Sequence, residues 1–262
     1  FWNPKNRINW VTLRKDGKPN FYGNMFGYHD VTDPSDTAME QPLAWITNAF
    51  DRSPGELLRV PKDAWSPLEG HLLECSYGEG RIHLVLPQAV AATAPGDPPR
   101  AQGGLVRLPM PDFPTGIMRG RFHPDDHALY VCGLFAWAGN KTAPGGLYRV
   151  RRTQTPLRVP VALAASADGF SVTFPEPLDR SRAGDPANWS YRTWRLARTA
   201  GYGSQHLDER TGTIVGATVS MAMDGESDPA VLSLPAASVN VPAATEIVPV
   251  TVELAVGVKV AV

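Results

Sequence analysis

Short strand patterns that keep returning along the chain constrain its fold more than any other feature. Runs of apolar and β-branched residues cover 8–13, 43–50, 55–61, 70–78, 80–87, 103–109, 117–124, 128–137 and 145–152. Turn residues separate these runs at the spacing typical of all-β folds. In the same region no segment of about a dozen residues sustains the 3.6-residue apolar period of a helix. The sequence therefore predicts an all-β chain.

The pattern also repeats. Residues 57–86 and residues 105–150 each contain a strand pair, a polar turn and a second strand pair. A unit of about 45 residues that returns in this way is typical of β-propeller blades, in which each four-stranded sheet buries its faces against its neighbours. We therefore predict that residues 1–153 form about three blades of a propeller.

The chain changes character at residues 151–161, where paired arginines, a polar stretch and two prolines indicate a domain boundary. Further strand patterns follow at 162–179, 188–196, 212–221 and 230–235. They predict an immunoglobulin-like β-sandwich of about 100 residues, and we assign residues 154–262 to it. Its last stretch, 248–262, is apolar and β-branched, which fits either a final strand pair or an altered terminus.

Charge and hydropathy exclude two classes of partner. Lys and Arg number 25 against 26 Asp and Glu, so no net field would attract nucleic acid or an anionic membrane. No run of about 18 apolar residues is present, so we predict no membrane span. The chain begins at Phe1 without a signal-peptide pattern, and we expect that it was cut from something longer.

Cysteine is rare. Cys75 and Cys132 are the two cysteines of the chain, which rules out a disulfide framework, a four-cysteine zinc site and a CxxCH haem attachment within these residues. Each lies in an apolar strand pattern, so we predict that both are small buried side chains.

Four long motifs carry a likeness to a known kind of protein. Residues 21–36, 45–80 and 118–140 resemble large secreted β-propeller proteins of planctomycete-type bacteria, and residues 173–209 resemble the immunoglobulin-like domain that follows in them. The propeller of those proteins is in turn distantly similar to the soluble sugar dehydrogenases that use pyrroloquinoline quinone (PQQ). The resemblance implies a six-bladed type of propeller whose first blades precede this chain.

The resemblance also implies a function. It suggests a periplasmic or secreted oxidoreductase, quinoprotein- or cytochrome-linked, that acts on or binds carbohydrate. The cofactors would be PQQ and calcium, or haem on a separate cytochrome c module or other domain of the same chain. In the similar dehydrogenases the catalytic base lies in early blades, so we expect this chain alone to be inactive. The alternative is a non-catalytic ligand-binding or scaffold module, because propellers host many unrelated functions.

One candidate site is the loop that contains His29 and Asp30, followed by Asp33 and Asp36. A histidine beside carboxylates can act as a general base. The aspartates Asp30, Asp33 and Asp36 can equally hold calcium, a hard cation that prefers oxygen ligands. The same side chains also cap turns by accepting backbone N–H groups, and the sequence leaves these three roles open.

A second candidate is the pair Arg119 and Arg121. Alternate residues of a strand share a face, and two guanidiniums on one face suit an anionic ligand such as a quinone carboxylate. The resemblance implies cofactor contact, because the similar dehydrogenases have an Arg-x-Arg pair in the corresponding blade. Here the pair falls a few residues later than that position. The alternative is ion pairing with Asp125, Asp126 or a neighbouring blade.

A third group is WITNAFDR, which contains Trp45, Asn48, Asp51 and Arg52. Residues at the start of an inner propeller strand face the central channel, where ligands commonly bind. Trp45 could stack on a sugar and Asn48 could hydrogen-bond to it. The alternative is a structural tryptophan between blades.

Overall fold

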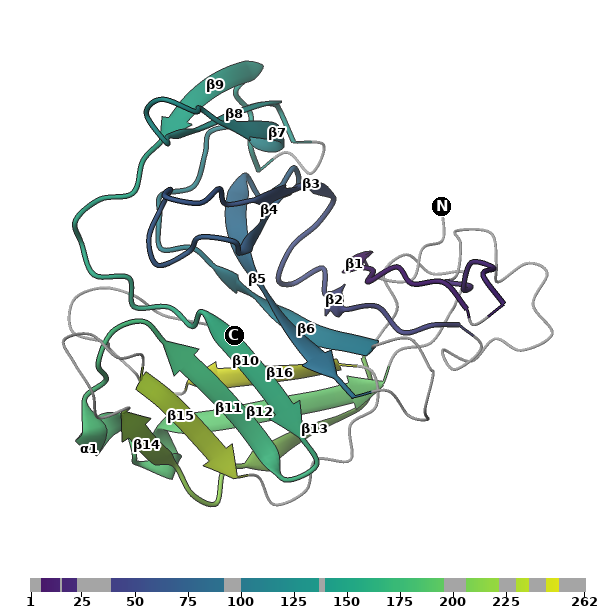
Figure 1. The fold of residues 1–262 in the computed structure, drawn as a ribbon, viewed down its shortest axis with the longest axis vertical. Helices are drawn as coiled ribbons and strands as arrows, with labels where there is room; N and C mark the ends of the chain where they lie inside the picture. The colour runs from purple at the N-terminus through teal and green to yellow at the C-terminus, as the bar shows by residue number, and fades with distance from the viewer. Residues whose placement is uncertain are drawn as a thin grey trace.

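The computed structural model describes residues 6–14, 16–22, 39–91, 100–136, 140–195, 206–221, 230–235 and 244–249. These residues form several antiparallel sheets with very little helix, which confirms the predicted all-β class (Figure 1). Among them, no helix is long and apolar enough to cross a membrane.

The largest sheet of the N-terminal region has four strands in sequence order. They are β3 (Pro54–Arg59), β4 (Leu72–Ser76), β5 (Arg81–Val90) and β6 (Arg100–Arg107). The turn between β4 and β5 needs a glycine, because Gly80 has a φ of 61° and a Cβ there would lie 2.4 Å from the carbonyl oxygen of Thr115.

Two smaller sheets flank the four-stranded sheet. One pairs β1 (Asn6–Ile8) with β2 (Ala44–Ile46), and β2 packs against β6. The other contains β7 (Gly116–Phe122), β8 (Leu129–Leu134) and β9 (Gly145–Val150), and β7 packs against β3 and β4. We call these three sheets the stack.

Alternation along the strands gives the four-stranded sheet two buried faces. Leu73, Cys75 and Leu84 point into the main core, which also contains Ile117 and Val131 of the β7–β9 sheet. The opposite face joins a second core, whose buried members are Ile8, Leu43, Ala44, Ile46, Val85 and Leu105. The middle sheet is therefore covered on both sides by its neighbours.

The C-terminal region contains two further sheets. One has the order β10–β11–β15–β14, with β10 (Ala162–Ser166), β11 (Gly169–Phe174), β14 (Thr218–Met221) and β15 (Ala230–Pro235). The other has the order β13–β12–β16, with β12 (Trp189–Arg195), β13 (Leu207–Thr213) and β16 (Ala244–Pro249). We call them the sheet pair. Residues 250–262 lie outside the described residues.

Side chains of β11 and β12 share one core between these sheets. Its buried members are Phe170, Val172, Phe174, Leu178, Ala183, Trp189, Tyr191 and Ile214. A short helix α1 (Arg180–Ala183) and the 3₁₀ turn η2 (Pro186–Asn188) lead into β12. Asp179 caps α1 by accepting the backbone N–H groups of Ser181 and Arg182.

The stack and the sheet pair contact each other along β10, which packs against β5 and β6 (Figure 1). In the segment between the two regions, residues 153–156 are exposed, whereas Leu157 and Val159 are buried in the main core of the stack. Because the sequence of this segment is polar and contains prolines, it did not predict that these two residues belong to the core.

The two cysteines have different surroundings. Cys75 is buried in β4, as predicted, but Cys132 is exposed, so the prediction that it is buried was wrong. Cys132 lies beside Arg119 and Leu147 on the face of the β7–β9 sheet that points away from β3 and β4. Leu147 is 74% exposed there. No described residue covers this face, whereas β7 covers a face of the β3–β6 sheet.

Candidate functional site

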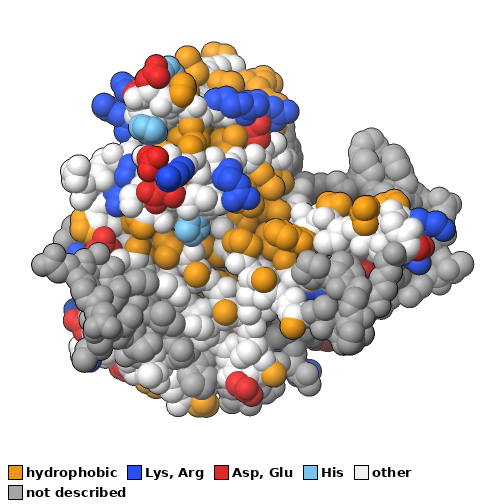
Figure 2. Space-filling view, viewed as in Figure 1, with side chains coloured by type: hydrophobic (Ala, Val, Ile, Leu, Met, Phe, Trp, Pro, Cys, Tyr) orange, Lys and Arg blue, Asp and Glu red, His pale blue; other side chains and the backbone are white. Residues whose placement is uncertain are grey.

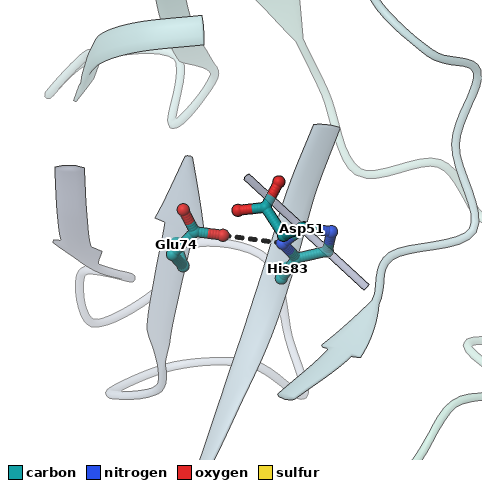
Figure 3. Close-up of side chains that lie close together, drawn as sticks. All are labelled: Asp51, Glu74 and His83. Atoms are coloured by element: carbon teal, nitrogen blue, oxygen red, sulfur yellow. Dashed lines mark hydrogen bonds and ion pairs between the residues drawn. The ribbon is translucent and has the colours of Figure 1, made fainter. Parts of the chain in front are cut away.

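Three ionisable side chains meet inside the stack: Asp51, Glu74 and His83 (Figure 3). Glu74 of β4 and His83 of β5 are direct partners across the antiparallel ladder. Asp51 follows a turn in which its backbone N–H donates to the carbonyl of Thr47 at 2.9 Å. Because Glu74 and His83 alternate with main-core residues, they point to the opposite face, where the segment between β2 and β3 covers them.

Short hydrogen bonds connect this buried cluster. His83 Nδ1 lies 2.6 Å from Glu74 Oε2, and the Ser76 hydroxyl donates to Asp51 Oδ1. The ring of Phe50 lies against His83, with 4.7 Å between the ring centroids. Asp51 and His83 are 0% exposed and Glu74 is 1% exposed. The cluster is therefore sealed from solvent, and an external substrate has no access to it.

Burial also sets the protonation states of the cluster. It raises the pKa of Asp51 to about 7, with a further contribution from the negative charge of Glu74. Burial raises the pKa of Glu74 to about 8, although the backbone N–H of Gly55 favours the charged form. It lowers the pKa of His83 to about 4, with Arg107 acting in the same direction. Burial therefore favours the neutral forms of both Glu74 and His83.

Three polar atoms of the cluster remain without a hydrogen-bond partner among the described residues. They are Asp51 Oδ2, Glu74 Oε1 and His83 Nε2. Buried polar atoms are usually satisfied, and each exception needs an explanation. A nitrogen and carboxylate oxygens in one closed space can either complete a hydrogen-bond network or hold a cation.

The candidate loop residues His29, Asp30, Asp33 and Asp36 lie outside the described residues. Their roles as base, calcium ligands or turn caps stay predictions.

Arg119 and Arg121 are exposed on β7, which has a bulge between Ile117 and Arg119. Arg119 Nη1 donates to the carbonyls of Met118 (2.8 Å) and Gly55 (3.3 Å). Arg121 Nη1 donates to Glu56 Oε1 of β3 at 2.8 Å. Arg121 thus makes the ion pair with a neighbouring sheet that was the alternative to cofactor binding.

Glu56 binds both the backbone and a side chain of β7. Its Oε2 accepts the backbone N–H of Gly120 at 2.9 Å. Partial burial opposes ionisation of Glu56, but the Gly120 N–H and the Arg121 guanidinium together lower its pKa. The carboxylate therefore stays charged and joins the two sheets.

Trp45 and Asn48 lie elsewhere in the stack. Trp45 is half-buried on β2, with the Arg7 guanidinium carbon 5.6 Å from its ring centroid. Asn48 is half-buried in the turn that follows. Because β2 shares a core with one face of the four-stranded sheet and β7 with the other, these two residues and the arginine pair lie on opposite sides of that sheet.

Exposed charges over the stack pair with one another. Asp112 binds both Arg81, at 2.7 Å, and Lys141, at 3.0 Å, and both partners lower the pKa of Asp112 to about 2. Arg149 contacts Asp126 at 2.6 Å. The face in Figure 2 shows basic and acidic side chains next to each other over these sheets, which fits the absence of a single-sign field in the sequence.

Sequence reasoning missed Glu74 and His83 and placed Asp51 in a channel instead of the interior. The available signal was a charged residue in the apolar run LLECS and a histidine in RIHLVL, joined by a tight turn. Antiparallel pairing across that turn brings the two side chains together.

Comparisons with protein-family models, curated proteins and solved structures found no match to this chain. The resemblance to planctomycete-type propeller proteins and PQQ-dependent sugar dehydrogenases therefore stays a prediction.

Proposed function

We propose that this chain is a non-catalytic scaffold and ligand-binding module, in which the last blades of a β-propeller hold an immunoglobulin-like sandwich in a fixed position. The parent protein would be a secreted or periplasmic multidomain protein. The observation that carries the proposal is the polar and apolar junction between the stack and the sheet pair.

Two glutamines of the stack bind the edge of the sheet pair at this junction. Gln102 Nε2 donates to Gln88 Oε1 (2.6 Å) and to the carbonyl of Ala165 (2.9 Å). The backbone N–H of Ala165 donates to Gln88 Oε1 at 2.8 Å. Both backbone groups of Ala165 are thus satisfied by side chains from β5 and β6. Such hydrogen bonds fix the angle between the two regions.

Apolar and loop contacts extend the same junction. Leu163 of β10 packs against the main core of the stack and against the core of the sheet pair. A ring nitrogen of His71 lies 3.0 Å from the carbonyl oxygen of Val161. With Leu157 and Val159 buried in the stack, the connection is rigid rather than a flexible linker.

The sheet topology supports the finer fold assignment. In the stack, the four-stranded sheet and the β7–β9 sheet each have their strands in sequence order and share one core. Neighbouring propeller blades pack in this way. The described strands of the sheet pair form two antiparallel sheets with one core between them, the architecture that immunoglobulin-like sandwiches share.

A polar ligand such as a carbohydrate would bind the exposed surface that carries Glu56, Arg119 and Arg121. A carboxylate and two guanidiniums offer acceptors and donors to sugar hydroxyls. The quinoprotein alternative has less support, because the acid–base groups Asp51, Glu74 and His83 are sealed from solvent. Residues 28–36, which that alternative also needs, lie outside the described part of the chain.

Two measurements on the full chain test this proposal. Calorimetry should show one unfolding transition. Gln102→Ala should lower the temperature of this transition or split the transition in two. Gln154→Ala, in the exposed part of the connecting segment, is the matched control and should leave the transition and its temperature unchanged. Dye reduction with glucose, PQQ and calcium should give no turnover. Two separate transitions in the unmodified chain would contradict the scaffold role, and turnover above buffer would contradict the non-catalytic role.

A further inference from the structure

The buried cluster has the composition and size of a metal site. Asp51, Glu74 and His83 each offer one ligand atom, and these three atoms lie within 4.8 Å of one another. Zinc accepts imidazole nitrogen and carboxylate oxygen and is commonly held by three or four protein ligands. Calcium prefers six to eight oxygen ligands, more than this cluster supplies. The donor set therefore favours a transition-metal ion of the zinc type.

The unpartnered atoms are a second and independent observation. Asp51 Oδ2, Glu74 Oε1 and His83 Nε2 are buried and accept or donate no hydrogen bond among the described residues. Leaving buried polar atoms unsatisfied is energetically unfavourable. A cation at Asp51 Oδ2 would give this buried oxygen a partner that the described residues do not supply.

The nearby basic side chains have other partners. Arg107 donates to the carbonyl of Phe50 at 2.8 Å, and Arg81 pairs with Asp112. Arg52 lies 3.9 Å from Glu79. Because these guanidiniums are directed elsewhere, they do not neutralise Asp51 and Glu74 by direct contact.

Ser76 adds a feature common to metal sites. Its hydroxyl donates to Asp51 Oδ1 and its Oγ accepts the backbone N–H of Glu79 at 2.8 Å. Ligating carboxylates are usually oriented by such outer hydrogen bonds. The Asp51 carboxylate is thus held in place with Oδ2 left over.

We propose that Asp51, Glu74 and His83 form a buried structural site for a divalent metal ion of the zinc type, which ties the segment before β3 to strands β4 and β5. The ion would be structural rather than catalytic, because the three side chains are closed to solvent.

The first experiment measures zinc binding to the full chain after metal removal with EDTA and dialysis. Titration calorimetry and elemental analysis should give one zinc ion per chain, with a higher unfolding temperature after zinc addition. Glu74→Gln and Asp51→Asn keep the side-chain shape and should weaken binding by at least about tenfold. Two control variants, Glu209→Gln and His206→Ala, change the exposed histidine–glutamate pair of the sheet pair. Both should leave the affinity for zinc unchanged.

A second experiment does not depend on the folding of any variant. Anomalous scattering at the zinc edge from crystals of the zinc-loaded chain should place a peak between Asp51, Glu74 and His83. A peak only at His206 and Glu209, or no bound zinc at all, would overturn the proposal. In that case the buried cluster is a hydrogen-bond network, and the scaffold function proposed above is unaffected.

Discussion

A histidine–glutamate pair occurs in each region of the molecule, and the two pairs differ in nearly every physical respect. In the stack, His83 and Glu74 come from two strands and are at most 1% exposed, with 2.6 Å between nitrogen and oxygen. In the sheet pair, His206 and Glu209 are three residues apart, with side chains 27% and 36% exposed and a 2.9 Å contact. The same two residue types thus form a buried and an exposed version of one contact.

The environment, rather than the residue types, determines what each pair can do. Burial raises the pKa of Glu74 to about 8, whereas the hydrogen bond from His206 lowers the pKa of Glu209. The buried pair therefore favours a neutral carboxyl group and the exposed pair a carboxylate. Solvent and salt weaken the exposed contact, but neither reaches the buried one.

The largest effect should follow from removal of the buried partner. Glu74→Ala leaves the His83 nitrogen unsatisfied and opens a cavity beside His83, so we expect a loss of about 2–5 kcal/mol in the free energy of unfolding. Urea denaturation measures it.

Glu209→Ala is the control for this variant, because it removes the same side chain from the exposed pair. It should leave the urea midpoint close to that of the unmodified chain. Equal losses in the two variants would show that burial does not distinguish the pairs.

A smaller effect should appear in the pH dependence of the metal-free chain. Between about pH 6.5 and pH 8 the unfolded chain has ionised carboxylates, whereas folded Asp51 and Glu74, with pKa values raised to about 7 and 8, still bind protons. The folded state therefore binds more protons, and its stability should decrease as the pH rises through this window. Below pH 6.5, His83 acts in the opposite direction, because its lowered pKa keeps it neutral in the folded state while the unfolded ring is protonated.

Urea midpoints in EDTA at several pH values measure this decrease. Glu74→Gln removes one of the two carboxyl groups and should make it shallower, whereas Glu209→Gln should not. A stability that stays constant between pH 6.5 and pH 8 would mean that Asp51 and Glu74 are already ionised in the folded chain.

Sequence alone predicted the parts of the fold that follow from local patterns. The short apolar runs in GHLLECSYG and GRIHLVLP, separated by turn residues, placed β4 and β5, because a strand that is buried on both faces has a nearly continuous apolar sequence. The prediction of burial failed where contacts between distant segments, rather than the local sequence pattern, decide whether a side chain is buried. Leu157 and Val159 lie in a polar, proline-containing segment but are buried by the stack, and Cys132 lies in an apolar run but is exposed.

The buried cluster was harder to predict, because its members come from separate segments. Asp51 belongs to a turn and was expected to face a channel, while Glu74 and His83 lie in apolar strands. Pairing of β4 with β5 could have suggested the Glu74–His83 contact. The approach of Asp51, however, depends on how the segment after β2 packs on the sheet, and no local pattern encodes that packing.

The smallest expected effect concerns the exposed pair and tests what holds it together. The His206 ring is stacked on the buried Trp194, with centroids 4.2 Å apart and 9° between the planes. If stacking dominates, His206→Ala should cost about 0.5–1.5 kcal/mol in the free energy of unfolding, while His206→Phe, which keeps an aromatic ring without a hydrogen-bonding nitrogen, should remain close to the unmodified chain. Urea denaturation at low and at high salt measures both variants.

If His206→Phe loses as much stability as His206→Ala, and the loss shrinks at high salt, the contact with Glu209 matters more than the stacking. The exposed pair would then depend on its polar contact, as the buried pair does, and the contrast between the two regions would be one of degree.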